Sequence, residues 1–576
     1  MKKNVITRIL TVSLAVLLCM ACTSVHKQGE TVDASVFGLK PDTGEDASGF
    51  IRKALEYCTG HHVTKLIIEP GRYDFYPEQT FETYLFISNN HDGLKSVAFL
   101  LKGMADFEIS APGAQFVFHG YTLPFVLENC RNVKLTGFSI NFARTFQSEG
   151  DILSVGNGKL EVSFSEEYPF KVENERLKFY DETGKIEYPF GNLLEFDPIR
   201  KETAYMARDY YIGNNLKAEQ TGPCSVRLHI PDIQGTPGNK MVFAPNHRLV
   251  PNIVIHRCED IEVDSITMYN SGGMGFIAQM SKNLTVSKMV VTPPSGKVVS
   301  CTADATHFSN CTGKIWIEDC LFENQMDDAT NIHGIYMRIK KKISPYKLLV
   351  QLVHHEQLGM DIFNPKDSVE MVDAKTMVTY AHAQIDSVKR LNKDFTEITF
   401  SDNLSEKVKI NDVVGATVTP DIVLRNTVCR RNRARGVLLG SRTSILIEGC
   451  TFHIGGAAIM TGGDSRYWFE QGGVSNMTIR NNIFDNCMFG NWGRAIISLD
   501  AGEEPEPADV PRFNRNVLVE NNEFRLVDSR IVSAVSVDGF VFRNNKIIRS
   551  DDYPFSSQQA EPFIMERSVH VDIEKE

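Results

Sequence analysis

Three aspartates stand in two motifs that nearly repeat each other. Residues 304–307 read DATH, residues 328–331 read DATN, and Asp327 directly precedes the second motif. A glycosidic bond is hydrolysed by a pair of carboxyl groups, one that donates a proton and one that activates water, so a doubled aspartate fits this chemistry. A solvated aspartate column or a calcium site would use the same residue type and stays open as an alternative.

The interval between the two motifs matches a repeat that runs through the chain. Each copy is a short strand of alternating apolar residues bounded by Asn, Gly or Asp, which is typical of a strand followed by a turn. The copies are residues 317–322, 447–452, 479–484, 519–524 and 542–547. The last two begin 23 residues apart, and Asp304 precedes Asp327 by the same number. A period in the low twenties predicts a β-solenoid, in which equivalent residues stack in columns.

The predicted fold is all-β, a right-handed parallel β-helix of the pectin-lyase-like kind. Neighbouring turns of such a solenoid, called rungs below, lie about 4.8 Å apart. Asp304 and Asp328 are therefore expected one above the other, with Asp327 beside that column and aimed elsewhere unless a bend redirects it. Like charges this close should raise the pKa of at least one of the carboxyl groups.

The segments around the repeats predict a cap and two insertions. Residues 37–58, FGLKPDTGEDASGFIRKALEYC, are turn-rich and lead into an amphipathic helix over 47–58 that would cover the open end of the solenoid. Residues 150–245 and 336–420 are charged, alternating and turn-rich, which predicts two inserted antiparallel β-barrel-like subdomains. The cap and rungs are then expected at 32–149, 246–335 and 421–576.

Composition and the first residues narrow the class of protein. The chain has 576 residues, a formal net charge of -11 and a pI near 5.8, which argues against nucleic-acid binding because that needs a basic face. Residues 1–21 have the layout of a lipoprotein-type secretory signal, with Cys22 as the lipidated residue and 22–31 as a polar tether. We expect a lipid-anchored protein of the bacterial cell envelope, in the periplasm or at the cell surface, that meets the membrane only through this anchor.

The remaining cysteines are predicted to be structural. Of the 12 in the chain, all but Cys19 and Cys22 are spread over a long sequence without a CxxC pair or zinc-like spacing. Cys320 and Cys450 occupy the position that Asn takes in the later copies of the repeat. Buried thiols filling the core are the expected state.

An aspartate followed one rung later by a double aspartate is also the outline of polygalacturonases. The chain lacks an evident counterpart of their Gly-His-Gly and Arg-x-Lys elements, which serve an acidic sugar. The closer resemblance is to glycoside hydrolase family 110, bacterial exo-acting α-1,3-galactosidases. It covers nearly all of the chain after the signal, and it is carried by the capping segment, the inserted β-domains and the motifs CTADATHF, NQMDDATNIHG, RARGVLLGSR and GGDSRYWFEQGGV.

This resemblance implies removal of terminal α-1,3-linked galactose from blood-group B-type or linear galactosyl glycans, with inversion at the anomeric carbon. It implies no cofactor and no metal. Carried over to this chain, Asp327 would be the acid, while Asp304 and Asp328 would activate water. Inverting hydrolases hold acid and base about 6.5–9.5 Å apart. We therefore expect Asp327 to be displaced from the stacked pair, and the negative charge of the pair to raise its pKa.

Seven further residues are candidates for contacts with the sugar. An aromatic ring can stack on the apolar face of galactose, and charged side chains can hold its hydroxyl groups. The candidates are His307, His333, Arg435, Arg442, Asp464, Trp468 and Glu470. A loop packed on the solenoid wall, satisfied turn histidines and surface arginines explain the same residues without a ligand.

Two other functions are compatible with the sequence. One is a different β-helix enzyme acting on glycans, either a polygalacturonase-like hydrolase or a lyase, which would need calcium and a basic catalytic residue; residues 327–334 contain no Lys or Arg. The other is a carbohydrate-binding solenoid without catalysis. For the galactosidase the expected partner is a galactose-terminated oligosaccharide or glycoconjugate, and side insertions are compatible with a homo-oligomer.

Overall fold

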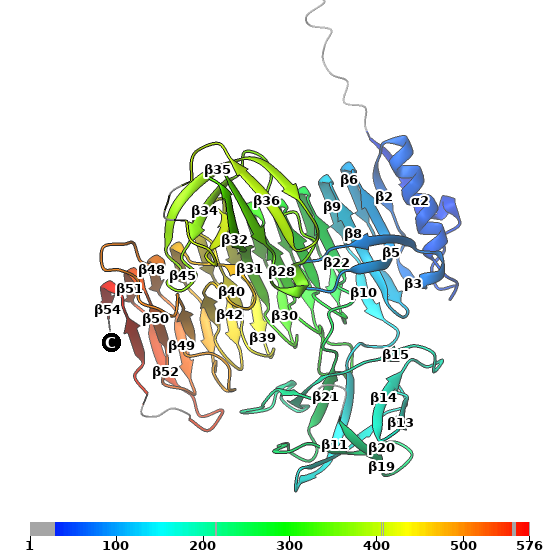
Figure 1. Cartoon of the computed structure of the whole chain (residues 1–576). Coiled ribbons are helices and arrows are strands. Elements are labelled where there is room, and N and C mark those ends of the chain that lie inside the picture. The colour runs from blue at the N-terminus through cyan, green and yellow to red at the C-terminus, as the bar shows by residue number, and fades with distance from the viewer. Residues whose placement is uncertain (1–28, 213–215, 405, 407, 556–559, 575–576) are drawn as a thin grey trace, which may run out of the picture.

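The computed structural model describes residues 29–212, 216–404, 406, 408–555 and 560–574, so the signal segment, Cys22 and most of the tether lie outside the described residues. The described chain is a parallel β-helix whose rungs contribute strands to three long sheets (Figure 1). In this part of the chain, no helix is long and apolar enough to cross a membrane.

Each of the three sheets runs along the solenoid. In the described residues, sheet A has thirteen strands, from β1 (Glu30–Asp33) to β54 (Val569–Ile573), and sheet B has eleven, from β3 (Gly71–Phe75) to β52 (Lys546–Arg549). Sheet C positions the candidate site. Its main path is β4 (Phe81–Leu85), β5 (Gly93–Lys102), β8 (Thr122–Glu128), β22 (Ile253–His256), β25 (Phe276–Gln279), β28 (Thr306–Ser309), β31 (Thr330–Ile335), β40 (Val437–Leu439), β43 (Ile459–Thr461), β47 (Ile497–Leu499), β50 (Val532–Val535) and β53 (Phe563–Glu566).

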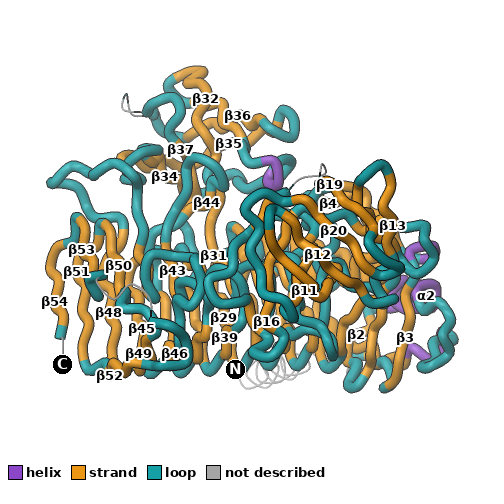
Figure 2. Tube along the Cα trace, turned by 90° about the horizontal axis from the view of Figure 1, so that it is seen from below, coloured by secondary structure: helices purple, strands orange, loops and turns teal. Residues whose placement is uncertain are grey.

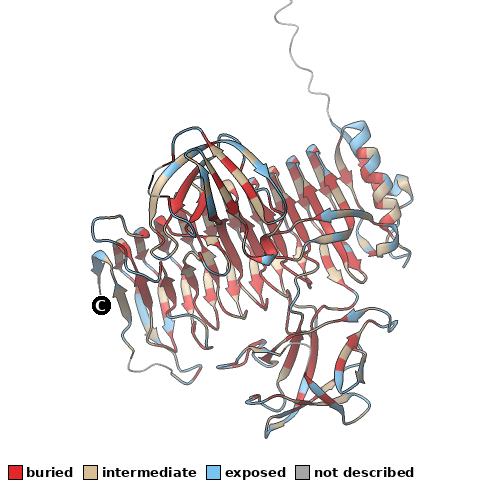
Figure 3. Ribbon diagram, in the orientation of Figure 1, coloured by how far each residue is buried: buried red, intermediate tan, exposed pale blue. Residues whose placement is uncertain are grey.

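The register of sheet A confirms the repeat predicted from the sequence. The first residue of every copy pairs with the first residue of a neighbouring copy or with the equivalent residue of an intervening rung. This column contains Val286, Ile317, Leu424, Ile447, Ile479, Val519 and Phe542. Each of these side chains is at most 1% exposed, and Figure 3 shows buried residues along the strands of the solenoid. Stacked burial of this kind is the main source of stability for a rung, which cannot bury its apolar face alone.

A buried amide ladder confirms a second equivalence from the sequence. The Nδ2 group of Asn482 donates to Oδ1 of Asn522, and that of Asn522 donates to Oδ1 of Asn545, both at 2.9 Å. One rung earlier, the backbone N–H of Cys450 donates to Oδ1 of Asn482. All ten described cysteines are free thiols and nine are buried. The prediction of buried thiols is thus confirmed for nine of them and wrong for the exposed Cys224.

A helix covers the N-terminal end of the solenoid, as the sequence predicted. Helix α2 (Ser48–His61) starts one residue later than expected and continues almost one turn further. Its buried face includes Ile51, Leu55 and Cys58, and the helix packs against β2 (Val63–Ile67) and β5 (Figure 1). The apolar end of the first rung is thereby kept from solvent.

The second insertion closes into an antiparallel barrel that follows β31 in the chain. Its strands, in the order in which they pair, are β32 (Met337–Ser344), β33 (Lys347–Gln351), β36 (Phe395–Phe400), β35 (Thr379–Arg390), β34 (Ser368–Val372) and β37 (Val413–Ala416). The short helix η4 (His355–Gln357) belongs to this insertion. The prediction of a barrel-like subdomain over 336–420 matches this result.

The first insertion lies between β10 (Ser139–Phe142) and β22. Its described strands form one open antiparallel sheet of eight strands and a second sheet of three, rather than a closed barrel. The larger sheet has the strands β11 (Ser148–Gly156), β12 (Lys159–Phe164), β16 (Asn192–Asp197), β17 (Glu202–Thr203), β18 (Tyr210–Tyr211), β19 (Lys217–Gln220), β20 (Ser225–His229) and β21 (Lys240–Ala244). Figure 2 shows both insertions beside the middle rungs of the solenoid.

Candidate active site

Asp304 and Asp328 lie one above the other, as predicted. Strands β28 and β31 pair in parallel with Thr306 opposite Thr330, and each aspartate stands two residues before its strand. The backbone N–H of Asp328 donates to Oδ1 of Asp304 at 3.2 Å. The two residues are 2% and 0% exposed, so the pair forms the floor of the site. Together with Asp327 they are called the aspartate trio below.

Arg435 continues the same column on the next rung. Because Thr330 pairs with Val437 of β40, the residue two positions earlier in that rung is Arg435. Its Nε group donates to Oδ1 of Asp328 at 2.7 Å, and Nη2 lies 3.5 Å from Oδ1 of Asp327. The guanidinium group thus joins the stacked pair to the third carboxylate.

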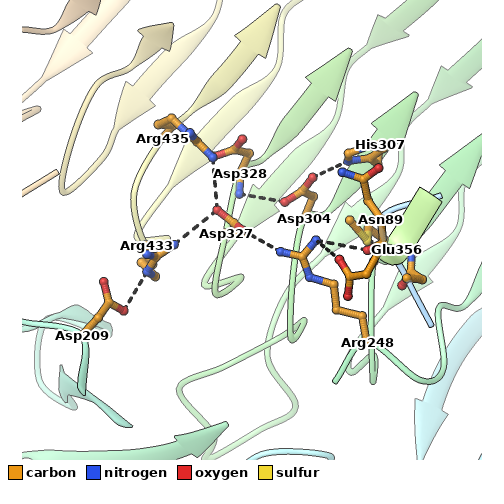
Figure 4. Close-up of polar contacts among 12 residues, drawn as sticks. Asn89, Asp209, Arg248, Asp304, His307, Asp327, Asp328, Glu356, Arg433 and Arg435 are labelled. Carbon is orange, nitrogen blue, oxygen red and sulfur yellow. Dashed lines mark hydrogen bonds and ion pairs between the residues drawn. The ribbon is translucent and has the colours of Figure 1, made fainter. Parts of the chain in front are cut away.

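Asp327 stands beside the column and carries most of the ion pairs. Its carboxylate lies 3.2 Å from Arg248, 3.4 Å from Arg433 and 3.5 Å from Arg435 (Figure 4). Burial acts to raise its pKa, but the three guanidinium groups outweigh burial and lower the pKa below the ordinary value. The expectation that like charges raise this pKa is therefore wrong, because the sequence spacing revealed the neighbouring acids but not the arginines.

The pKa values of the stacked pair, in contrast, are raised. Burial, followed by the charge of Asp327, raises the pKa of Asp304 to about 8. Burial also raises the pKa of Asp328 well above its usual range, although Arg435 works against this. Since the trio lies so close together, its protons belong to the group and move between its members. The directions of these shifts favour negative charge on Asp327 and protons on the pair.

The spacing within the trio is shorter than the resemblance implied. One carboxylate oxygen from each of the three lies within 4.8 Å of the other two. These oxygens are closer together than the roughly 6.5–9.5 Å at which inverting glycosidases usually hold the carboxyl groups of the acid and the base. The cause is the solenoid itself, since adjacent rungs are about 4.8 Å apart and Asp327 is the chain neighbour of Asp328.

Within the described part of the chain, two groups of side chains have donor atoms close enough to share a metal ion. One is the aspartate trio, and the other is His91, His355 and Glu356 at the edge of the barrel insertion. The trio already faces three guanidinium groups, which offset the negative charge that would attract a divalent cation. Glu356 likewise pairs with Arg248 at 3.7 Å and with His91 at 3.3 Å.

The charge balance of the trio leads to an expectation about chelation. Activity should survive dialysis against EDTA, since water and carboxyl groups supply the chemistry and the arginines take the place of a cation. The measurement is turnover before and after chelation, with calcium and zinc added back separately. Loss of turnover that calcium restores would assign the trio to a metal site and contradict this account.

A cavity of about 890 Å³ opens in front of Asp327. Tyr211 and Asn246 from the first insertion and His355 and Glu356 from the second contribute to its wall. A neighbouring cavity of about 510 Å³ shares part of this lining. The shared residues are Arg435, Met460, Trp468, Arg494 and Asp500. The two insertions therefore turn one open face of the solenoid into a walled site of the size that binds small ligands.

Five of the seven predicted sugar-contact residues line these cavities. They are His333, Arg435, Asp464, Trp468 and Glu470. Strand β44 (Glu470–Gln471) pairs with the end of β31, with Gly334 opposite Gln471, which brings the loop beside the trio. The carboxylate of Asp464 also accepts hydrogen bonds from the backbone N–H groups of residues 466–468, so it shapes the loop that presents Trp468.

The other two predicted sugar contacts are wrong. His307 is 1% exposed and lies behind Asp304, with its Nδ1 atom 2.7 Å from Oδ2 of that residue. Arg442 forms an ion pair with the buried Glu370 of the barrel insertion and lines a separate pocket. It joins the insertion to the solenoid and takes no part in the site, because it follows β40 whereas Arg435 precedes that strand.

Several polar and charged residues of the site were not among the predicted sugar contacts. Arg248 precedes β22 at the return from the first insertion, and Arg433 is also paired with Asp209 of that insertion at 2.8 Å. Asn89 donates to Oε1 of Glu470 at 3.0 Å from the loop between β4 and β5. Of these residues only Arg433 could have been found from the sequence, because it precedes Arg435 by two residues in the RARGVLLGSR motif.

Comparisons with known proteins agree with the architecture. The family descriptions GLAA-B beta-barrel domain I and GLAA-B beta-barrel domain II match residues 148–239 and 347–414, which are the two insertions. Alpha-1,3-galactosidase A of Shewanella woodyi is 33% identical over 99% of this chain and 94% of its own length. Alpha-1,3-galactosidase B of Bacteroides thetaiotaomicron is 31% identical over 94% of this chain and 89% of its own.

A solved structure, the family 28 exopolygalacturonase of Yersinia enterocolitica, matches with 12% identity and a TM-score of 0.41, covering 95% of this chain and 79% of that one. A parallel β-helix with a buried carboxyl trio, of which Asp327 lines a walled cavity, together with these curated relatives, defines an enzyme that hydrolyses glycans. The chain belongs to glycoside hydrolase family 110.

Proposed function

We propose that this protein is an inverting exo-α-1,3-galactosidase that releases terminal α-1,3-linked galactose. The observation that carries the proposal is the stacked Asp304–Asp328 pair with Asp327 beside it, facing a cavity that both insertions wall off. The relatives named alpha-1,3-galactosidase support the choice of sugar and linkage. A walled cavity suits attack at the end of a glycan chain, where one sugar must fit completely.

The stacked pair is suited to hold the attacking water. Oδ2 of Asp328 is buried and has no hydrogen-bond partner among the described residues. A water molecule placed there would satisfy this oxygen and could also reach Asp304. Asp327 faces the cavity with 17% of its side chain exposed and is the member of the trio that can reach the glycosidic oxygen. In the proposed reaction it gives that oxygen a proton while the pair removes one from water.

This division of roles requires a proton to move when the sugar binds. In the empty site Asp327 is ionised by its arginines and the pair carries the protons. One oxygen from each member of the trio lies within 4.8 Å of the others, a gap that one bridging water closes, so a proton can pass from Asp328 to Asp327 through that water. In the reacting form Asp327 carries the proton and Asp328 is ionised, which is one of the ways in which the trio can distribute its protons.

The raised pKa values of the stacked pair lead to an expected pH dependence. Asp304 loses its proton above a pH of about 8, and burial also raises the pKa of Asp328 well above its usual range. Once both protons are lost the trio has none to give to the leaving group, so kcat/KM should fall at alkaline pH, above about 8. Rate profiles on an α-1,3-linked disaccharide and on an activated aryl galactoside test this. The aryl substrate needs less acid assistance and should show a weaker fall; a disaccharide rate that keeps rising well above that pH contradicts the expectation.

A second mechanism is favoured by two specific observations. The trio is as compact as the carboxyl pairs of retaining enzymes, which are about 5–5.5 Å apart, and Asp327 is ionised, as a nucleophile must be. In that case Asp327 would form a glycosyl-enzyme intermediate, and the product would keep the α configuration. The inverting assignment follows the family resemblance, and the buried pair with an unpartnered oxygen supports it.

A substrate panel tests the proposed function. Purified protein is incubated with a linear α-1,3-galactosyl disaccharide, a fucose-branched blood-group B trisaccharide, an α-1,4-linked isomer and polygalacturonate. Free galactose from one or both of the α-1,3 substrates, and none from the others, is the expected result. Galacturonate oligomers would identify a polygalacturonase-like enzyme or lyase, and binding without any release would identify a carbohydrate-binding solenoid. Lipid anchoring at Cys22 is part of the proposal, and Cys22→Ser should move the protein out of the membrane fraction.

A further inference from the structure

A line of buried side chains leads from Asp304 away from the rest of the trio. Nδ1 of His307 lies 2.7 Å from Oδ2 of Asp304, and Nε2 of His307 lies 2.9 Å from Nε2 of His333. Nε2 of His333 also lies 3.5 Å from Oε1 of Glu470. The two histidines are 1% and 5% exposed, and His333 and Glu470 both line the smaller cavity. Asp304 is thus connected to a cavity that it does not itself line.

The backbone sets the direction of these hydrogen bonds. Nδ1 of His333 lies 2.7 Å from the carbonyl oxygen of Gly334, which can only accept, so this nitrogen carries a hydrogen. In a neutral His333, Nε2 is therefore an acceptor and receives the Nε2–H of His307. Nδ1 of a neutral His307 is then also an acceptor, and the hydrogen between it and Asp304 belongs to the carboxyl group.

The surroundings agree with a neutral His307 and a protonated Asp304. Burial and the neighbouring His333 hold the pKa of His307 well below its ordinary value. The other charged or titratable groups that face this line are Asp327, Asp328, Arg248, Arg435 and His354. Arg248 opposes a positive charge on His307, whereas Glu470 favours one, and Oε1 of Glu470 lies 3.5 Å from Nε2 of His333.

We propose that His307, His333 and Glu470 form a proton relay that takes the proton from Asp304 and so makes this residue the base. The inference rests on the proposed function, in which the stacked pair activates water. Oδ2–H of Asp304 gives its proton to Nδ1 of His307, while the Nε2–H proton of His307 passes to Nε2 of His333. Asp304 becomes a carboxylate, His307 stays neutral in its other tautomer, and His333 becomes an imidazolium ion beside the carboxylate of Glu470.

The reaction conserves protons when the relay operates. One proton moves from Asp304 to His333, and none is lost or gained by the protein. During turnover Asp304 takes a proton from water and Asp327 gives one to the leaving oxygen. The proton on Asp304 then returns to Asp327 through a water that bridges one oxygen of each, which lie within 4.8 Å of each other. His307 contacts no substrate in this scheme and is a positioning residue, while His333, which lines the smaller cavity, acts on the reaction through His307.

The relay is tested with Glu470→Gln, which keeps the shape of the side chain but removes its charge. Without that charge the imidazolium form of His333 is less stable, so kcat at neutral pH should fall by about 10²-fold, for disaccharide and aryl substrates alike. The deficit relative to wild type should shrink above a pH of about 8, where Asp304 loses its proton to solvent without the relay. His333→Asn should show the same pattern.

His256→Gln is the matched control. His256 is a half-buried histidine of the same sheet that contacts Gln279 and lies outside the site, so its replacement should leave the pH profile unchanged. A deficit in Glu470→Gln that lies in KM and is the same at every pH would show that Glu470 only holds the sugar, and would overturn the relay. A wild type that releases no galactose would instead overturn the proposed function.

A measurement without substrate tests the direction of the relay on its own. The infrared spectrum of the resting protein at neutral pH should contain the carbonyl band of a protonated carboxyl group that disappears in Asp304→Asn. Nitrogen NMR of histidine-labelled protein should show His307 protonated at Nε2 and His333 at Nδ1. A spectrum of Asp304→Asn identical to that of the wild type in this band would mean that Asp304 is ionised at rest, which contradicts the relay.

Discussion

Asp327→Asn is expected to lower kcat/KM for an α-1,3-linked galactosyl disaccharide by roughly 10²–10⁴-fold. The second sugar of the disaccharide is a poor leaving group and needs a proton on the glycosidic oxygen, which the amide side chain of the variant cannot supply. An activated aryl galactoside loses its aryl group without that help and should be affected much less. The measurement is kcat/KM for both substrates in parallel.

The variant should fold, because each arginine around Asp327 retains another acidic partner. Arg433 keeps Asp209, Arg248 keeps Glu356, and Arg435 keeps Asp328. Asp264→Asn, on the outer face of the solenoid and bonded to Ser287, is a suitable control and should keep both activities. An equal loss on the two substrates would assign Asp327 the part of a nucleophile, as in the retaining mechanism.

Asp304→Asn and Asp328→Asn are expected to slow the disaccharide and the aryl substrate alike, each by roughly 10²–10⁴-fold. Water attack is needed for both substrates, so the leaving group should not matter. If the two carboxyl groups hold one and the same water, the double variant should cost little more than either single variant. Rates for the two singles and the double on both substrates test this.

These two substitutions should not unfold the protein. The pair is protonated in the resting site, so an amide replaces a neutral group of nearly the same shape. Thermal unfolding of the variants should therefore resemble that of the wild type. A single variant that keeps full activity, or a double variant whose loss is the product of the two single losses, would contradict a shared water.

Much of the fold could be predicted because it is periodic. The copies of the repeat imposed the register of sheet A, and the same period was enough to place Asp304 over Asp328. The closed barrel and the open sheet could not be told apart, because antiparallel strands of similar sequence form both, and the pairing partners that decide closure are far apart in the chain. The charged, alternating pattern of residues 150–245 and 336–420 located the insertions without showing that they wall the site.

The electrostatics of the site could not be predicted. The acids are neighbours in the chain or one rung apart, but the residues that lower the pKa of Asp327 are not. Arg248 is 79 residues away in the sequence and Arg433 is 106. The sign of the pKa shift depends on these distant groups, so the spacing of the aspartates alone gave the wrong direction. In the same way, the position of His307 three residues after Asp304 suggested a contact with the sugar, but its ring lies behind Asp304.

The central claim, that the trio hydrolyses an α-galactoside by inversion, is tested most directly by the anomer that is released first. Proton NMR of the reaction is recorded from the earliest time points, before galactose equilibrates between its anomers. The account predicts that β-galactose appears first and that the α anomer grows in afterwards. If α-galactose appears first, the enzyme retains configuration, Asp327 is its nucleophile, and the roles assigned here to the stacked pair are wrong.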